Sequence, residues 1–362
     1  MEGLSQAEAF ARIRLLRSPN VGPVSYRQLL HRFGAAEAAL SALPDLIQRG
    51  GGGYRPAAED RIAAEVQAVR TAGARYLFHD SPDYPPLLAE QDGAPPILTC
   101  RGDANLALRP CVAIVGARNA SAAAVKLARM FAGELAEAGY VVVSGLARGI
   151  DGAAHQASLS GGTIGVIASG IDVAYPPEHA DLQEAVASQG LLLAEQPPGT
   201  EPLARHFPSR NRIIAGIAAG TLIVEAAPKS GSLITARLAG EAGREVMAVP
   251  GSPLDSRSQG CNQLIRDGAT LVQRTDDVIE LLTGFQGQPR SILREVSAEW
   301  GVLPEQTEDP ADIAGLLTTA PVAVDELVRQ SGASAGAVQL ALLELELGGR
   351  LVRHAGGRVS RA

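Results

Sequence analysis

The sequence contains few aromatic residues, few cysteines and no excess of positive charge. Aromatic residues make up 4 % of the chain, which disfavours a nucleic-acid site built from many stacked rings. The formal net charge of −7 argues against a polyanion binder held by its overall charge, so any nucleic-acid site must be local. The three cysteines lie far apart without a CxxC pair, which argues against a disulfide framework or a zinc ribbon. We therefore expect no metal and a reducing, cytoplasmic compartment.

Long apolar runs are also missing. No stretch of about 18 uncharged apolar residues occurs, and the N-terminal segment carries Glu2 and Glu8 without an apolar leader-like centre. A membrane span is therefore not expected. Apolar residues are nevertheless abundant, at 46 % of 362 residues, and a chain of this length exceeds one ordinary core. We expect two or three domains.

Residues 1–80 are expected to form a small helical domain. The helical patterns LSQAEAFARIRLL and SYRQLLHRF flank the turn Pro19–Pro23, and AEDRIAAEVQAVRTAG follows. The segment PNVGPVSYRQLL resembles a helix-hairpin-helix, whose turn amides can face a phosphate, although Asn20 stands where such motifs usually have a first glycine. The alternative, two helices joined by an ordinary Pro/Gly turn, is the interpretation we favour.

Residues 81–283 are expected to form a doubly wound, Rossmann-like α/β domain with a parallel sheet. Short apolar runs rich in Val and Ile alternate with helical stretches that are closely followed by glycine. Such runs are typical of buried parallel strands, and helices between them complete the α/β pattern. The expected strands are CVAIVG, YVVVSG, TIGVIAS, LLLAEQ, TLIVEA and EVMAVPG.

The last part of the chain predicts a linker at 284–309, with Trp300, and a winged helix at 310–362. The pattern is a helix, a short extended piece, two helices separated by SGAS and a glycine-containing hairpin. The second of the two helices, at 334–347, has two Glu and no Lys or Arg, so it is a poor reader of a DNA groove. We favour a protein-contact or regulatory role, while Arg350, Arg353 and Arg358 in the wing leave phosphate contact open.

Cations gather in the loops that follow the expected strands. In an open parallel sheet these loops converge at the binding crevice. Glycines in the same loops let backbone amides at helix N-termini approach an anion. Four loops predict a site for several phosphates, although any one cation can instead pair with a neighbouring acid. The cations are Arg118, Arg148, Arg205, Arg210, Arg212 and Lys229.

Neighbouring side chains add hydrogen bonding and stacking to this predicted site. Asn211 lies between two of the arginines, and Gly231, Ser232 and Thr235 are expected to supply amides and hydroxyls. Phe207, between two basic stretches, is a candidate for stacking on a base, with a role as a core anchor equally open. Tyr175, ahead of two prolines, is better interpreted as a brace for its loop.

Cofactor and enzyme signatures are weak. The first loop reads GARNAS instead of the G-x-G-x-x-G that dinucleotides require, so no cofactor is expected. No G-x-S-x-G elbow, P-loop or H-E-x-x-H occurs. Asp151 and His155, four residues apart on one helix face, are a possible acid/base couple. The favoured alternative places Asp151 in the first helical turn for the dipole and packs His155 below it.

The run from Ala113 to about Val272 resembles the central domain of the DprA/Smf family of bacterial DNA processing proteins. The matching motifs are AIVGARNAS, VSGLARGIDGAAH, GVIASGIDVAYPPEH, EQPPGTEP, HFPSRNRIIAGI, VEAAPKSGSLITARLA and AVPGS followed by QGCNQLIRDGA. The resemblance implies single-stranded DNA binding by Arg118, Arg205, Arg210, Arg212 and Lys229. It also implies loading of the RecA recombinase in natural transformation and homodimers formed through the Rossmann-like domain. The flanking units that it implies are a helical, SAM-like N-terminal domain at 1–80 and a C-terminal winged-helix domain.

The expected function is therefore a non-enzymatic single-stranded-DNA mediator that protects incoming DNA. Two other functions stay open. A nucleotide-processing, phosphoribohydrolase-like enzyme would need a base, for which Asp151 and Glu225 are the candidates. A pure adaptor would bind protein and no DNA.

Overall fold

The computed structural model describes residues 4–48, 54–91, 93–283, 313–354 and 356–362. They fall into two compact units. One comprises the described residues of Met1–Ala63 and Leu293–Ala362, and the other comprises those of Ala64–Ile292. The expected linker at 284–309, with Trp300, lies outside the described residues.

The N-terminal part of the first unit is helical, as expected. The Ser5 hydroxyl caps the first helix by accepting a hydrogen bond from the Glu8 amide at 3.1 Å. Leu15, Leu29 and Leu43 are fully buried in the shared core of the first three helices. The helices are α1 (Gln6–Leu16), α2 (Pro23–Phe33), α3 (Ala36–Gln48) and α4 (Glu59–Thr71), the last of which crosses the boundary between the units.

The C-terminal part of the first unit has the expected order of a winged helix. Two helices precede a strand pair, and Val322 at the edge pairs with Val359 to complete a three-stranded sheet. In the wing, Arg353 Nε donates to Glu346 Oε2 at 2.9 Å, so this arginine already has a carboxylate partner. The elements are α13 (Ile313–Leu316), β10 (Val322–Ala323), α14 (Val324–Ser331), α15 (Ala335–Leu347), β11 (Leu351–His354) and β12 (Arg358–Arg361).

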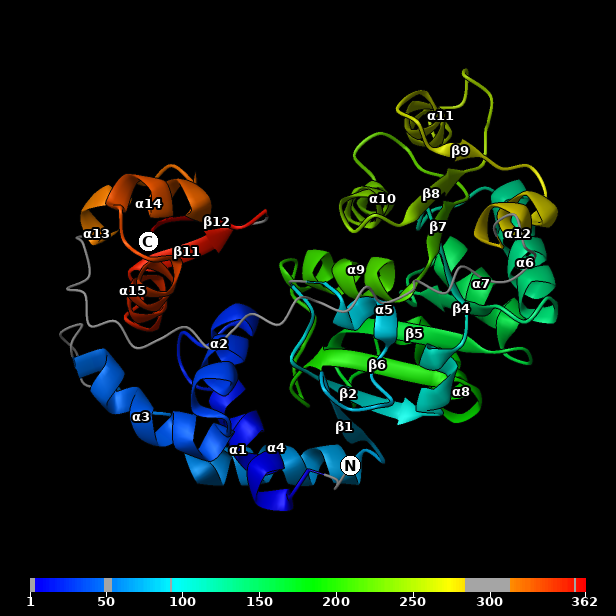
Figure 1. Ribbon diagram of the computed structural model, residues 1–362. Helices are drawn as coiled ribbons and strands as arrows, with labels where there is room; N and C mark the ends of the chain where they lie inside the picture. The colour runs from blue at the N-terminus through cyan, green and yellow to red at the C-terminus, as the bar shows by residue number, and fades with distance from the viewer. Residues whose placement is uncertain (1–3, 49–53, 92, 284–312, 355) are drawn as a thin grey trace. The chain divides into compact units, whose positions relative to one another are not determined.

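The second unit is built on a nine-stranded sheet with the order β1-β2-β6-β5-β4-β3-β7-β8-β9 (Figure 1). The strands from β3 to β9 are parallel, whereas β1 and β2 join the edge antiparallel. The expected Rossmann-like parallel sheet is therefore confirmed. The six expected strands are β3 (Cys111–Val115), β4 (Val141–Ser144), β5 (Thr163–Gly170), β6 (Leu191–Gln196), β7 (Gly220–Ile223) and β8 (Glu245–Ala248).

Three further strands extend the sheet beyond the expected six. β1 (Arg75–Phe78) falls within the range 1–80 that we expected to be helical, and β2 (Ile97–Gly102) pairs with it. β9 (Thr270–Leu271) extends the opposite edge. All three lie toward the edges of the sheet, where short strands depend on the neighbouring strand and leave little periodicity in the sequence.

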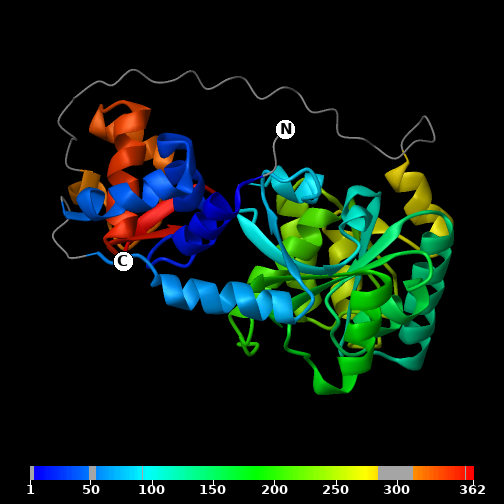
Figure 2. The same ribbon diagram turned by 90° about the horizontal axis from the view of Figure 1, so that it is seen from below.

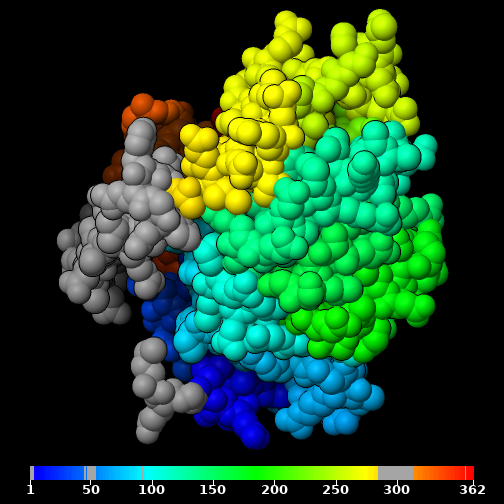
Figure 3. Space-filling model, turned by 90° about the vertical axis from the view of Figure 1, so that its right-hand side faces the viewer, coloured from blue at the N-terminus to red at the C-terminus, as the bar shows by residue number. Residues whose placement is uncertain are grey.

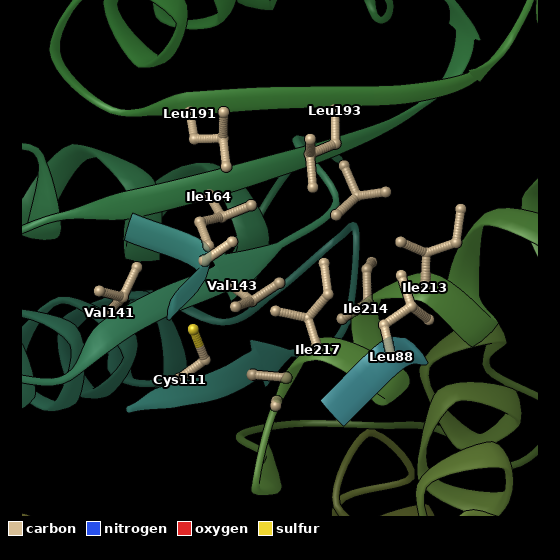
Figure 4. Close-up of a cluster of buried hydrophobic side chains, with 14 of the residues drawn as sticks. Leu88, Cys111, Val141, Val143, Ile164, Leu191, Leu193, Ile213, Ile214 and Ile217 are labelled. Carbon is tan, nitrogen blue, oxygen red and sulfur yellow. The ribbon is translucent and has the colours of Figure 1, made fainter. Parts of the chain in front are cut away.

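Helices cover both faces of the sheet (Figure 2). Successive residues in a strand point to opposite faces, so Val141 and Val143 pack in one layer and Val142 packs in the other. Figure 4 shows the first layer, in which strand residues meet Ile213, Ile214 and Ile217. That layer contains α5 (Pro86–Ala89), α9 (His206–Ile217), α10 (Gly231–Glu241) and α11 (Gln259–Arg266).

The opposite layer buries Phe131 and Leu135 against the strands. Thr275 Oγ1 donates to Glu134 Oε2 at 2.5 Å and ties the last helix of the unit to the first of this layer, side by side in Figure 3. The helices of this layer are α6 (Ala122–Glu137), α7 (Ile150–Ser158), α8 (Ala180–Gln189) and α12 (Thr275–Leu282). The 3-10 turn η1 (Ala104–Leu108) packs in the first layer, and the 3-10 turn η2 (Pro177–His179) precedes α8. Among the described helices, none has the length and apolar character needed to cross a membrane.

Candidate nucleic-acid interface

The strand order places a topological switch point at β3. This strand has β4 on one side and β7 on the other, and ligands of open α/β sheets bind outside the carboxyl ends of the strands at such a point. The loop after β3 carries Arg118, the loop after β4 carries Arg148, and the loop after β7 carries Lys229. Three of the predicted cations therefore lie on the loops that frame the switch point.

A cleft of about 80 Å³ opens at this edge. A single water needs about 10–15 Å³ measured in this way, so the cleft has room for a polar group of several atoms. Three arginines and two aromatic rings contribute to its lining. They are Arg118, Arg148, Arg210, Tyr175 and Phe207.

Arg118 and the two aromatic residues form a contact cluster in the lining of the cleft. The Arg118 guanidinium carbon lies 5.1 Å from the centre of the Phe207 ring, within the range of a cation–π contact. The Tyr175 and Phe207 ring centres are 5.9 Å apart with an interplanar angle of 56°. Tyr175 is 40 % exposed. Phe207 therefore holds Arg118 beside the cleft. Tyr175, for which the sequence suggests a role as a brace for its loop, also adds an accessible ring to the cleft.

Arg210 is buried, unlike the other cations of the site, with 6 % of its surface exposed. Its Nη1 donates to the backbone oxygen of Val166 at 2.6 Å and to that of Gly145 at 2.5 Å. Burial lowers the pKa of Arg210 to about 10, opposed by the charge of Asp151, and the side chain therefore stays protonated at neutral pH. We conclude that Arg210 shapes the floor of the cleft through its hydrogen bonds to the loop after β4 and to strand β5.

The floor requires glycine at position 145. A Cβ atom added to Gly145 would lie 2.1 Å from Arg210 Nη1 and 2.5 Å from its Cζ, far inside contact distance. The Gly145 amide also donates to Asp151 Oδ2 at 3.1 Å. The glycine of this loop thus lets a buried guanidinium pass close to the backbone.

The other predicted cations divide into paired and unpaired groups. Arg212 pairs with Glu195 and donates to the Gly93 backbone oxygen at 2.6 Å, with 23 % of its side chain exposed. Arg148 pairs with Glu178, and both side chains are largely exposed, so the pair is weak and a phosphate can replace the carboxylate. Among the described residues, no carboxylate forms an ion pair with the exposed side chains of Arg118, Arg205 or Lys229.

The Lys229 loop lies next to the Arg210 helix. Asn211, itself buried, donates from Nδ2 to the Gly231 backbone oxygen at 3.4 Å. Lys229 adopts a left-handed backbone conformation with φ 66°. Residues other than glycine adopt this conformation rarely, and mainly where the surrounding structure requires it. Ser232 and Thr235 are 8 % and 2 % exposed, so among the predicted hydrogen-bonding groups of this loop Gly231 is the accessible one.

The candidate catalytic groups are engaged in structural contacts. Glu225 is buried and accepts from the Ser121 amide at 3.0 Å and the Ser121 hydroxyl at 2.7 Å, which fixes the loop containing Arg118. Burial raises the pKa of Asp151. Burial also lowers the pKa of His155 to about 3, and its Nδ1 lies 2.8 Å from Thr163 Oγ1. A neutral, fully buried histidine fits the packing interpretation of the Asp151 and His155 pair.

The loop after β8 adds a cation that the sequence analysis did not include. Arg257 is exposed and its Nη2 lies 3.2 Å from Asp255 Oδ2. Leu254 in the same loop is 95 % exposed. The sequence carries the signal for this cation, because the loop follows the sixth expected strand, β8, just as the other cationic loops follow theirs.

Comparison with protein families identifies all three parts of the chain. The family described as DNA recombination-mediator protein A matches residues 75–283. The DprA-like N-terminal HHH domain matches residues 6–68, and the DprA winged helix domain matches residues 301–357. The expected helical and winged-helix flanks of the α/β domain are therefore confirmed.

Individual relatives match between 57 % and 94 % of this chain. Protein Smf from Synechocystis sp. is 33 % identical over 94 % of this chain and 96 % of its own. The crystal structure of DNA processing protein A from Streptococcus pneumoniae matches 76 % of this chain and 98 % of its own with a TM-score of 0.65 and 35 % identity. A structure of the Helicobacter pylori protein, described with its single-stranded DNA binding mode, matches 57 % of this chain and 95 % of its own with a TM-score of 0.52 and 30 % identity. The chain belongs to the DprA (Smf) family.

Proposed function

We propose that this protein binds single-stranded DNA in the cleft at the β3 switch point and acts as a DNA processing mediator without catalysing a reaction. The observation that carries the proposal is the set of three exposed cations, Arg118, Arg205 and Lys229, on loops at one edge of the sheet. The protein has a net charge of −7, and within the described part of the chain these three cations have no carboxylate partner. Such cations at a glycine-rich strand edge are suited to phosphates.

The cleft also suits a single strand better than a duplex. Tyr175 and Phe207 offer ring faces beside Arg118, and a base can stack on such a ring when it is not already paired within a helix. Arg148 can exchange Glu178 for a phosphate. We assign phosphate contacts to Arg118, Arg148, Arg205 and Lys229, stacking to Phe207 with Tyr175, and support of the cleft to Arg210, Asn211, Arg212, Ser232 and Thr235.

The wider role follows the family. We propose that the protein protects incoming single strands in the cytoplasm, helps load the RecA recombinase during natural transformation, and forms a homodimer through the α/β domain. We retain the domain ranges 1–80, 81–283 and 310–362 for this role, with 284–309 as the linker. Size-exclusion chromatography with light scattering measures the oligomeric state, and a monomer at micromolar concentration contradicts the proposed dimer.

Replacing Arg118 with alanine is expected to make oligo-dT binding less dependent on salt. Each phosphate contact on a single strand contributes about −0.7 to the slope of log affinity against log salt, so the slope should become shallower by about that amount. Fluorescence anisotropy of labelled oligo-dT across a salt series measures it. Arg118→Lys keeps the charge and should keep the slope, whereas Arg129→Ala, on the exposed face of α6, is the matched control. An unchanged slope in Arg118→Ala contradicts the assigned contact.

The absence of a catalytic step has its own test. Glu225 and Asp151 are the candidate bases, and both are buried and hydrogen-bonded within the protein. Incubation with nucleoside monophosphates should therefore release no free base in a chromatographic assay. Release that disappears in Glu225→Gln supports a phosphoribohydrolase-like enzyme instead.

A further inference from the structure

Helix α15 of the winged helix is apolar on two opposite sides. Val338, Leu342 and Leu345 pack into the core of the winged helix itself. Leu343 and Leu347, four residues apart, belong to a different core. At about 100° per residue the two groups point in opposite directions, so this one helix contributes to two separate cores.

The second core is that of the N-terminal helices. Leu343 and Leu347, 3 % and 1 % exposed, cluster with Leu15, Leu29 and Leu43 from α1, α2 and α3. Removing a leucine side chain from water is favourable in proportion to the apolar area that is buried. The burial of these two side chains therefore favours contact between the winged helix and the N-terminal helices of this unit.

The turn at Asn20 meets the C-terminal end of α15. Asn20 has φ 59°, and its Nδ2 donates to the backbone oxygen of Leu347 at 2.9 Å. The last carbonyl groups of a helix have no partner within the helix and carry partial negative charge. The asparagine that replaces the usual first glycine of a hairpin turn thus supplies a donor to a helix end.

A side-chain contact on α2 adds specificity. Gln28 Nε2 donates to Gln339 Oε1 at 2.9 Å, and the Glu346 carboxylate lies 3.8 Å from the position that a Cβ atom of Gly22 would take. One side of α15 therefore receives three kinds of contact. They are the leucine packing, the hydrogen bond from the Asn20 turn to the helix end, and the side-chain amide bond from α2.

We propose that α15 is an intramolecular docking helix, whose Leu343–Leu347 side binds the N-terminal helices of the same chain. In the docked state this side of α15 cannot enter a DNA groove, and Asn20 faces a carbonyl group where a hairpin turn would face a phosphate. The inference concerns the first unit and does not depend on the proposed cleft in the α/β domain.

Crosslinking in the full-length protein tests the docking. Gln28→Cys and Gln339→Cys are introduced together, and a short flexible bismaleimide is added to bridge the two thiols. The native Cys100, Cys111 and Cys261 are buried and burial raises the pKa of each thiol to about 11, 12 and 11, so they react slowly. The matched control pairs Gln28→Cys with Arg329→Cys, on the exposed side of α14.

The expected result is a crosslink within one chain, formed at least about tenfold faster than in the control pair, because docking raises the effective concentration of the two thiols. Equal rates in both pairs, or a crosslink found only between two chains, overturns the proposal. The peptide masses distinguish these outcomes, and a mixture of isotopically labelled and unlabelled protein identifies crosslinks between copies.

Hydrogen exchange provides a second measurement. Leu343→Ser with Leu347→Ser should speed amide exchange in α2 by at least about tenfold, whereas β11 and β12 should keep their protection because their core uses the other side of α15. Protection of α2 that does not change while β11 and β12 stay folded contradicts docking through these leucines.

Discussion

Replacing Arg210 with methionine is expected to lower the free energy of unfolding of the α/β unit by about 3–5 kcal/mol at neutral pH. Methionine fills much of the same volume, but the backbone oxygens of Gly145 and Val166 lose their buried donor. An unsatisfied buried polar group costs about 1–3 kcal/mol. Asp151 also loses the positive charge that offsets its burial. Urea denaturation followed by far-ultraviolet circular dichroism measures the loss.

The pH dependence of Arg210→Met identifies the cause. Burial already raises the pKa of Asp151, and the Arg210 charge opposes that rise. Without Arg210, the folded-state pKa rises further above the unfolded value near about 4. A raised folded-state pKa means that stability is highest at low pH and falls as pH rises toward neutrality. The variant should therefore lose more stability at pH 7 than at pH 5, and adding Asp151→Asn should remove that difference.

Arg212→Met is the matched control for burial. Arg212 pairs with Glu195, and 23 % and 20 % of the two side chains are exposed, so solvent screens this pair more than it screens the buried Arg210 and the expected loss is smaller. A loss of similar size in both variants contradicts a special role for Arg210. Equal losses at pH 5 and pH 7 in Arg210→Met leave the hydrogen bonds as the cause and remove Asp151 from the explanation.

The central strands of the fold were predictable because they are buried on both faces. Runs such as CVAIV and YVVVS admit few interpretations other than inner parallel strands, and β3 and β4 lie there. The edge strands β1 and β9 were not predictable. Thr270–Leu271 has two residues and no periodicity, and Arg75–Phe78 pairs only because β2 lies beside it.

The strand edge that carries the candidate cleft was predictable, whereas the burial and contacts of its individual side chains were not. Placing Arg118 and Lys229 at a strand edge requires only the order of strands and loops in the sequence. That Arg210 is buried while Arg205 is exposed depends on where α9 packs against β5, which no local pattern encodes. Tyr175 reaches Phe207 across two loops that are distant in sequence, so its part in the cleft required the structure.

Replacing Arg118, Arg205 and Lys229 together with alanine is expected to weaken binding of oligo-dT by about 100-fold at physiological salt. Each exposed contact to a phosphate is assigned about 1 kcal/mol, below the range for buried charged hydrogen bonds, and about 1.4 kcal/mol corresponds to a tenfold change in affinity. The slope of log affinity against log salt should become shallower by about 2 because three phosphate contacts are lost. Anisotropy titrations at several salt concentrations measure both quantities.

The net charge of the chain makes one control variant decisive. Arg70, Arg129 and Arg266 are exposed on α4, α6 and α11, and none of them lies on a loop of the switch point. Replacing these three with alanine removes the same charge, from −7 to −10 (−7 − 3). If long-range attraction by the whole protein governed binding, the two triple variants would weaken it equally. We expect the control variant to bind within about threefold of the wild type, since salt at physiological concentration limits the range of interactions between exposed charges to about 8 Å. Equal weakening in both variants would mean that DNA is not held by the cleft, whereas loss confined to the first assigns binding to the cations at the β3 switch point.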